Sequence, residues 1–126
     1  MTSKYVQISG ELIKAYSIPG EQGLALAVDT PAYSVVTTGE VAGGTVQAQL
    51  PDVTSRFALI RAAADNTGKV YIGAGTAVTK ADGTADATTG YPLAAGNEMV
   101  YLGSNLNLLY RICDNAGDDL IYISYR

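Results

Sequence analysis

The chain contains no histidine and no tryptophan among its 126 residues, and it has a single cysteine, Cys113. Without histidine, the serine–histidine–aspartate triads and the usual zinc sites are excluded. One cysteine can form neither an intrachain disulfide nor a cysteine cluster for a metal. Because Cys113 lies in an apolar run and no histidine can act as its base, we expect a buried structural thiol, not a nucleophile.

Charged residues are also scarce, at 16% of the chain against about 25% in a typical soluble domain. So few charges indicate either protein contacts over much of the surface or a small β domain coated with threonine and serine. The net charge is −4 and the eight basic residues are scattered, which argues against a nucleic-acid partner.

Long apolar runs are missing as well. No stretch approaches the ~18 apolar residues that a membrane-spanning helix requires. Residues 1–5 lack the basic and apolar segments of a signal peptide. We therefore expect no membrane partner and a product made in the cytoplasm.

What the chain does have is alternation of apolar and polar residues, the period of a β-strand. Residues 55–64 fit either a helix or a strand, and we favour a strand buried on both faces because Phe57 and Leu59 alternate with Ala58 and Ile60. Both faces of the segment 120–125 are apolar, which predicts a central or covered strand. The other predicted strands are residues 5–9, 12–18, 24–28, 33–38, 45–50, 69–73, 99–103 and 108–113.

Turn-forming residues recur every ~8–12 positions, the spacing of a sandwich or barrel. The fold prediction is therefore all-β: one antiparallel β-sandwich or jelly-roll-like domain over residues 1–126. Residues 1–54 are a possible arm or interface region and residues 55–126 a compact β module. A glycine- and threonine-rich segment, residues 81–89, is predicted to be an exposed loop.

The densest acidic cluster is the segment from Asp114 to Asp119. Clustered carboxylates can bind calcium, but the EF-hand spacing is absent and we favour a solvated hairpin turn. No pair of carboxylates is singled out for acid–base chemistry. We expect no enzyme activity, no cofactor, no metal site and no catalytic residue.

Nine tyrosines supply almost all the aromatic mass, with one phenylalanine beside them. A tyrosine ring is apolar and its hydroxyl can stay wet, which suits interfaces and half-buried sheets. Three interpretations stay open: a subunit or partner interface, plain strand packing, and a platform on which sugars stack. The residues expected to contact a partner are Tyr5, Tyr16, Tyr33, Tyr91 and Tyr125.

Residues 70–73 (VYIG), 90–98 (GYPLAAGNE) and 109–110 (LY) follow one another in a distinctive order, with NTG at 66–68 and VT at 78–79. Over roughly residues 60–126 this order resembles a module of small structural proteins in tailed bacteriophages. That module occurs in head decoration (cement) proteins and in some fibre- or spike-associated proteins. The chain departs from it by a longer loop at residues 81–89.

The resemblance implies a structural virion protein and no catalytic residues. The expected function is that of a capsid decoration protein on the outer surface of the head. Such a protein stabilises the shell by binding the major capsid protein, and the expected assembly is a homotrimer. The alternative is a receptor- or glycan-binding module of a phage fibre or spike.

Overall fold

The computed structural model describes residues 4–8, 11–15 and 33–126, and the chain divides into two units, residues 1–32 and 33–126. In the first unit, β1 (Lys4–Ile8) and β2 (Glu11–Ala15) pair as an antiparallel hairpin. The region predicted over residues 1–54 is thus divided at residue 33, and its later strands belong to the second unit. The strand predicted at residues 24–28 lies outside the described residues.

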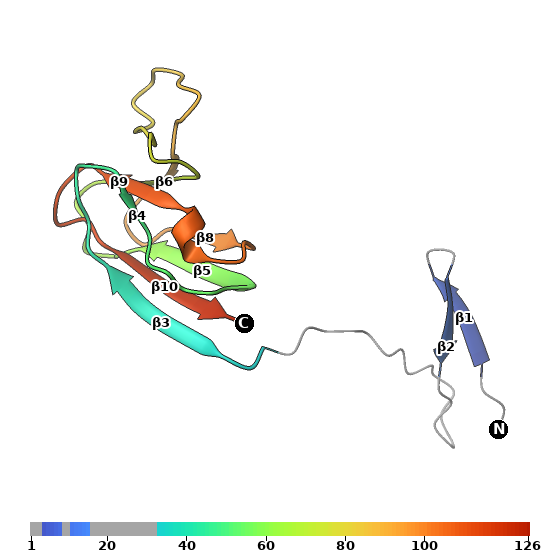
Figure 1. Cartoon of the computed structure of the whole chain (residues 1–126). Helices are drawn as coiled ribbons and strands as arrows, with labels where there is room; N and C mark the ends of the chain where they lie inside the picture. The colour runs from blue at the N-terminus through green and yellow to red at the C-terminus, as the bar shows by residue number, and fades with distance from the viewer. Residues whose placement is uncertain (1–3, 9–10, 16–32) are drawn as a thin grey trace. The chain divides into compact units, whose positions relative to one another are not determined.

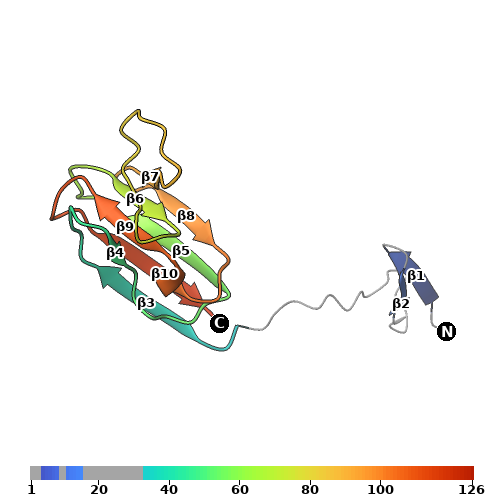
Figure 2. The same ribbon diagram turned by 45° about the horizontal axis from the view of Figure 1, so that its top comes forward.

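The second unit is a sandwich of two antiparallel sheets (Figures 1 and 2). It confirms the predicted all-β fold. The first sheet has the order β3 (Val36–Val41), β10 (Leu120–Tyr125), β5 (Phe57–Ala62), β8 (Glu98–Tyr101). The second sheet has the order β4 (Ala48–Gln49), β9 (Tyr110–Cys113), β6 (Val70–Gly73), β7 (Tyr91–Leu93).

Alternate residues of each strand build the core between the sheets, because side chains point to opposite faces along a strand. On β5, Ala58, Ile60 and Ala62 are fully buried, and Leu120 joins them from β10. The second sheet contributes Val70, Ile72, Leu93 and Cys113. Cys113 is therefore the buried thiol that the sequence predicts, and burial raises its pKa.

The connection from β3 to β4 leads from the first sheet to the second, and hydrogen bonds from one buried cation, Arg111, fix its position. The Arg111 guanidinium donates to the carbonyl oxygens of Val46 at 2.7 Å and Ala42 at 3.0 Å. Only 9% of Arg111 is exposed. Each of these charged hydrogen bonds satisfies a carbonyl that the link would otherwise leave without a partner.

The strand predicted at residues 120–125 is confirmed as β10, and its central position between β3 and β5 is also confirmed. Residues 57–62 are likewise a strand, as favoured over a helix. The prediction that this strand is buried on both faces is wrong. Phe57 and Leu59 are only half-buried and Arg61 is exposed, because no part of the second unit covers this side of the sheet.

Two other predicted strands are shorter in the structure, and the segment 90–98 contains a strand that was not predicted, β7. This strand tolerates Pro92 because it lies at the edge of its sheet, where hydrogen bonds are needed on one side only. The strand predicted at 108–113 begins later than expected, because a 3₁₀ turn, η1 (Leu106–Leu108), precedes it. The Asn105 side chain caps this turn by accepting from the Asn107 N–H at 2.9 Å. The strand predicted at 45–50 shrinks to the two residues of β4.

The segment between β6 and β7 is a long loop that projects beyond the two sheets (Figure 1). A parallel bridge between Thr79 and Thr89 closes its base. Gly83 has φ +97°, a value that favours glycine. Residues 81–89 are all exposed, which confirms the predicted exposed loop.

Candidate protein-binding surface

The side of the first sheet that faces away from the core is a continuous apolar surface, which we call the outer face. Strand pairing aligns its residues in rows across the four strands. One row joins Val36, Tyr125 and Phe57, and the next joins Thr38, Ile123, Leu59 and Val100. A third row, Glu40, Ile121, Arg61 and Glu98, brings charges to one end.

The exposure of the aliphatic side chains on the outer face is high for residues of their type. Val36 is 56% exposed, Val100 is 54% exposed and Ile121 is 43% exposed. Single exposed apolar residues are normal on proteins, but a contiguous patch marks an interaction site or an aggregation hazard. These residues come from three of the four strands, so the patch extends across the sheet.

Three aromatic rings gather at one end of the outer face. The Tyr125 ring lies 5.7 Å from the rings of both Tyr33 and Phe57, and the other two rings are 6.5 Å apart. Together they line a hollow of about 270 Å³. Backbone pairing between Val35 and Arg126, at 2.9 Å in both directions, holds the segment of Tyr33 beside the end of β10.

A second hollow, of about 290 Å³, lies farther along the same face. Leu59, Ile121 and Ile123 are among its lining residues, with Arg61 and Glu98. The outer face is therefore an apolar surface with two depressions and a charged margin. Such a surface can receive apolar side chains of another protein.

The five tyrosines predicted to contact a partner do not lie on one surface. The structure brings Tyr33 and Tyr125 together on the outer face, whereas Tyr91 is 62% exposed at β7, in the other sheet. The side chain of Tyr5 and the whole of Tyr16 lie outside the described residues. The sequence prediction missed Phe57, Leu59 and Ile123, although their period-2 alternation was the available signal.

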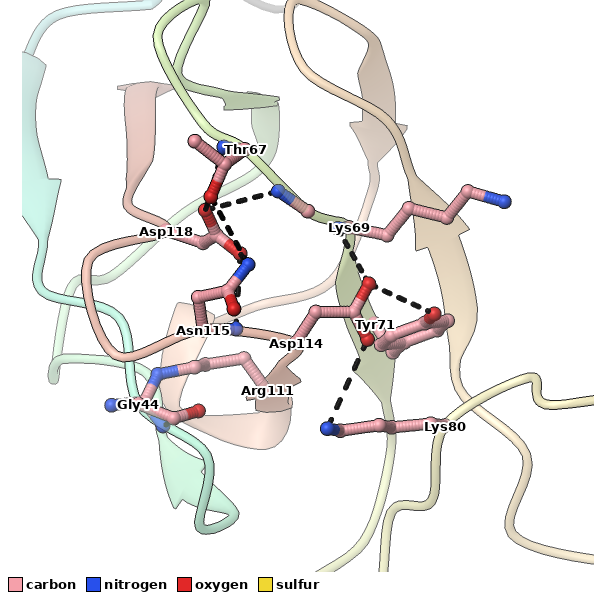
Figure 3. A network of polar contacts seen from close by, with 10 residues as sticks. Gly44, Thr67, Lys69, Tyr71, Lys80, Arg111, Asp114, Asn115 and Asp118 are labelled. Carbon is pink, nitrogen blue, oxygen red and sulfur yellow. Dashed lines mark hydrogen bonds and ion pairs between the residues drawn. The ribbon is translucent and has the colours of Figure 1, made fainter.

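In the structure, the acidic segment from Asp114 to Asp119 is fixed by hydrogen bonds to a buried carboxylate, that of Asp118 (Figure 3). We call Asp118 together with its donors Thr67, Gly68 and Asn115 the lock. Asp118 is only 1% exposed, so the prediction of a solvated turn is wrong for this residue. Its Oδ1 accepts from the N–H groups of Thr67 at 2.9 Å and Gly68 at 3.2 Å. Its Oδ2 accepts from the Asn115 N–H at 3.1 Å and from the Asn115 Nδ2 at 3.0 Å.

This bonding decides the chemistry of Asp118. Burial by itself raises the pKa of the carboxyl, but hydrogen bonds from Gly68, Thr67 and Asn115 outweigh it and hold the pKa below its ordinary value. Both carboxylate oxygens are engaged by donors from the protein. Across residues 4–8, 11–15 and 33–126, no group of three acidic or cysteine side chains could hold a metal ion.

Asp114 sits beside the lock and ties the long loop to the second sheet. Its Oδ2 accepts from the Lys69 N–H at 2.9 Å, and its Oδ1 lies 3.8 Å from the Lys80 Nζ (Figure 3). The Tyr71 hydroxyl donates to the same Oδ2 at 3.5 Å. Burial and the neighbouring Asp114 charge raise the pKa of Tyr71, which keeps this donor protonated.

Comparison with protein-family models, curated proteins and solved structures finds no match to this chain. Within the part of the chain that the structure describes, no helix is long and apolar enough to cross a bilayer.

Proposed function

We propose that this chain is a structural protein without catalytic activity that binds other protein subunits through the outer face. Its most specific form is a capsid decoration (cement) protein that stabilises a bacteriophage head by binding the major capsid protein. The observation that carries the proposal is the apolar outer face, with its aromatic hollow left open. The phage resemblance of residues 60–126 supplies the kind of partner.

The size of the outer face supports an assembly of several copies. Four strands about 4.8 Å apart and six residues at about 3.4 Å each give a footprint of about 400 Å². A stable interface buries about 800 Å² on each partner. One outer face alone is therefore a weak contact, and a homotrimer on a repeating capsid surface would strengthen it through effective concentration.

A substitution set tests the outer face directly. Val36→Thr, Val100→Thr and Ile121→Thr combined keep β-branched side chains on strands but remove apolar surface. Val46→Thr is the matched control, because Val46 is 70% exposed and lies on the β3–β4 connection, away from the outer face. Unfolding midpoints of both variants establish that each remains folded.

The measurements are the mass of the protein in solution and its co-sedimentation with expanded capsids of the phage that carries the gene. We expect a trimer that binds capsids, at least about tenfold weaker binding by the triple variant, and unchanged binding by the control. A monomer that ignores capsids would overturn the proposal. So would a triple variant that binds as well as the wild type. A trimer that binds glycans and not capsids would select the fibre or spike alternative.

A further inference from the structure

A third depression lies where the chain leaves β7 in one sheet and enters β8 in the other. It has a volume of about 430 Å³, within the range of small-molecule sites. Six of its seven lining residues come from one short segment: Tyr91, Pro92, Leu93, Gly96, Asn97 and Glu98, with Arg61 of β5 as the seventh. We call it the corner hollow. Most of the GYPLAAGNE motif that the sequence singled out therefore builds this feature.

Backbone hydrogen bonds hold the corner hollow in one shape. The Gly96 N–H donates to the Ala62 carbonyl at 3.0 Å, and the Ala62 N–H donates to the Asn97 carbonyl at 2.9 Å. Gly96 has φ +80°, so a glycine suits this turn. Leu93 is buried in the core and anchors the other wall. The backbone of such a fixed frame loses little freedom when a ligand arrives, and only the side chains that contact the ligand must become ordered.

The side chains around the corner hollow offer unused polar groups beside one open ring. Arg61 and Glu98 pair across β5 and β8, yet their charged groups form no ion pair. Within the described residues, the side chains of Arg61, Asn97 and Glu98 make no hydrogen bond to the protein. They present guanidinium and amide donors and carboxylate and amide acceptors. The Tyr91 ring, 62% exposed, lines the same hollow.

This combination discriminates between classes of ligand. A phosphate group would meet Glu98 beside Arg61 and a chain of net charge −4, so repulsion offsets the gain from the guanidinium. A purely apolar molecule would leave Arg61 and Glu98 desolvated and without partners. A polyhydroxylated ring satisfies both demands, because its hydroxyls accept from Arg61 and Asn97 and donate to Glu98 while its C–H face stacks on Tyr91.

We propose that the corner hollow binds a pyranose unit of a glycan. The single small site implies a weak intrinsic affinity, with a dissociation constant on the order of millimolar. Several copies in one assembly would raise the overall affinity for a repetitive glycan through effective concentration. The site shares Arg61 and Glu98 with the charged margin of the outer face, but Tyr91, Pro92 and Asn97 line the corner hollow alone. Substitutions at Tyr91 and Asn97 therefore separate this proposal from the capsid-binding proposal.

The test is an NMR titration of the full chain, labelled with ¹⁵N, against three probes: methyl β-galactoside, methyl β-glucoside and methyl β-glucuronide. We expect at least one probe to shift the amides of residues 91–98 and 61 in a saturable way. Tyr91→Ala should weaken that binding at least about fivefold. Tyr33→Ala, which removes a 45% exposed tyrosine on the outer face, is the matched control and should leave sugar binding unchanged.

Both variants change exposed side chains, and their amide spectra report whether each remains folded. Absence of saturable shifts with all three probes would overturn the proposal, as would equal binding by the folded Tyr91→Ala variant. If Tyr91→Ala alters the fold, Asn97→Ala, which removes one exposed amide, takes its place with the same criterion. Capsid binding by Tyr91→Ala should equal that of the wild type, so failure of one proposal does not imply failure of the other.

Discussion

The two faces of the β3–β10–β5–β8 sheet are built by alternate residues of the same strands, yet they have opposite surroundings. On β5, Ile60 points to the core and is fully buried, while its neighbour Leu59 points to the outer face and is half-buried. The inner face packs against the second sheet. Hydrogen bonds from Arg111 fix the β3–β4 connection, and hydrogen bonds to Asp118 fix the turn at residues 67 and 68. Apart from the Tyr33 ring, which packs on Phe57 and Tyr125 at one end, no part of the second unit covers the outer face.

This comparison teaches that apolar character and burial within one domain are separate properties. Both faces carry Ile, Leu, Val and aromatic residues, because both are suited to exclusion from water. Only the inner face is covered within the sandwich, by the second sheet. A face that is apolar but uncovered in the isolated domain is physically reasonable when another molecule supplies the cover.

We expect the largest loss of stability from a substitution on the inner face. Ile60→Ala should lower the free energy of unfolding by about 3–4 kcal/mol, because it removes buried methyl groups and leaves a cavity between the sheets. Urea denaturation followed by tyrosine fluorescence measures the change. A loss below about 1 kcal/mol would mean that the core relaxes around Ile60 and that the inner face is less tightly packed than the structure shows.

The lock at Asp118 should give the next largest effect. Asp118→Asn places an NH₂ group against backbone donors and should cost about 2 kcal/mol at neutral pH. Because the folded-state pKa of Asp118 is depressed, its contribution is present above the ordinary aspartate pKa and is lost as the pH falls below about 4. Unfolding curves from pH 7 to pH 2 should therefore converge for the two proteins.

Asp86→Asn is the control for that experiment, since Asp86 is exposed in the long loop and its side chain accepts no hydrogen bond from the described residues. Its unfolding free energy should match the wild type within about 0.5 kcal/mol. Parallel curves for wild type and Asp118→Asn at every pH would show that the Asp118 carboxylate does not stabilise the fold.

We expect the smallest loss of stability from the corresponding substitution on the outer face. Ile121→Ala makes on the outer face the same chemical change as Ile60→Ala on the inner face, but Ile121 is 43% exposed. We expect a loss below about 1 kcal/mol in dilute solution. A loss that equals the one at Ile60 would show that the outer face is already covered, and its dependence on protein concentration would show whether other copies cover it.

Period-2 alternation was enough to predict the sandwich and the position of β10, because a strand with two apolar faces fits the middle of a sheet. The same pattern misled the prediction for β5. Apolar residues on both faces predict burial on both, whatever supplies it. The sequence of one chain carries no information on whether the second cover comes from the same chain or from a partner.

Other features depended on contacts between distant residues and left only a faint signal. Asp118 looked like one more turn residue, since its donors Thr67 and Gly68 lie 51 and 50 positions away in the chain. The sequence analysis made no prediction for Arg111, although a lone cation in the apolar run 108–113 was the available signal for a buried, hydrogen-bonded side chain. The corner hollow could not be predicted from the motif at residues 90–98, because Arg61 joins it only after β5 and β8 pair.

The central position of β10 has a consequence for how the domain forms. Its partners β3 and β5 come from far earlier in the chain, and the Ser34 hydroxyl and the Arg126 carbonyl meet across 92 positions. Local hairpins cannot assemble the first sheet, because its middle strand arrives only after a long loop has closed. We therefore expect the domain to fold slowly, as β-sandwiches dominated by contacts between distant residues do. Until β10 docks, the edges of β3 and β5 stay open to any other strand, so chaperones and dilute conditions should favour a high yield.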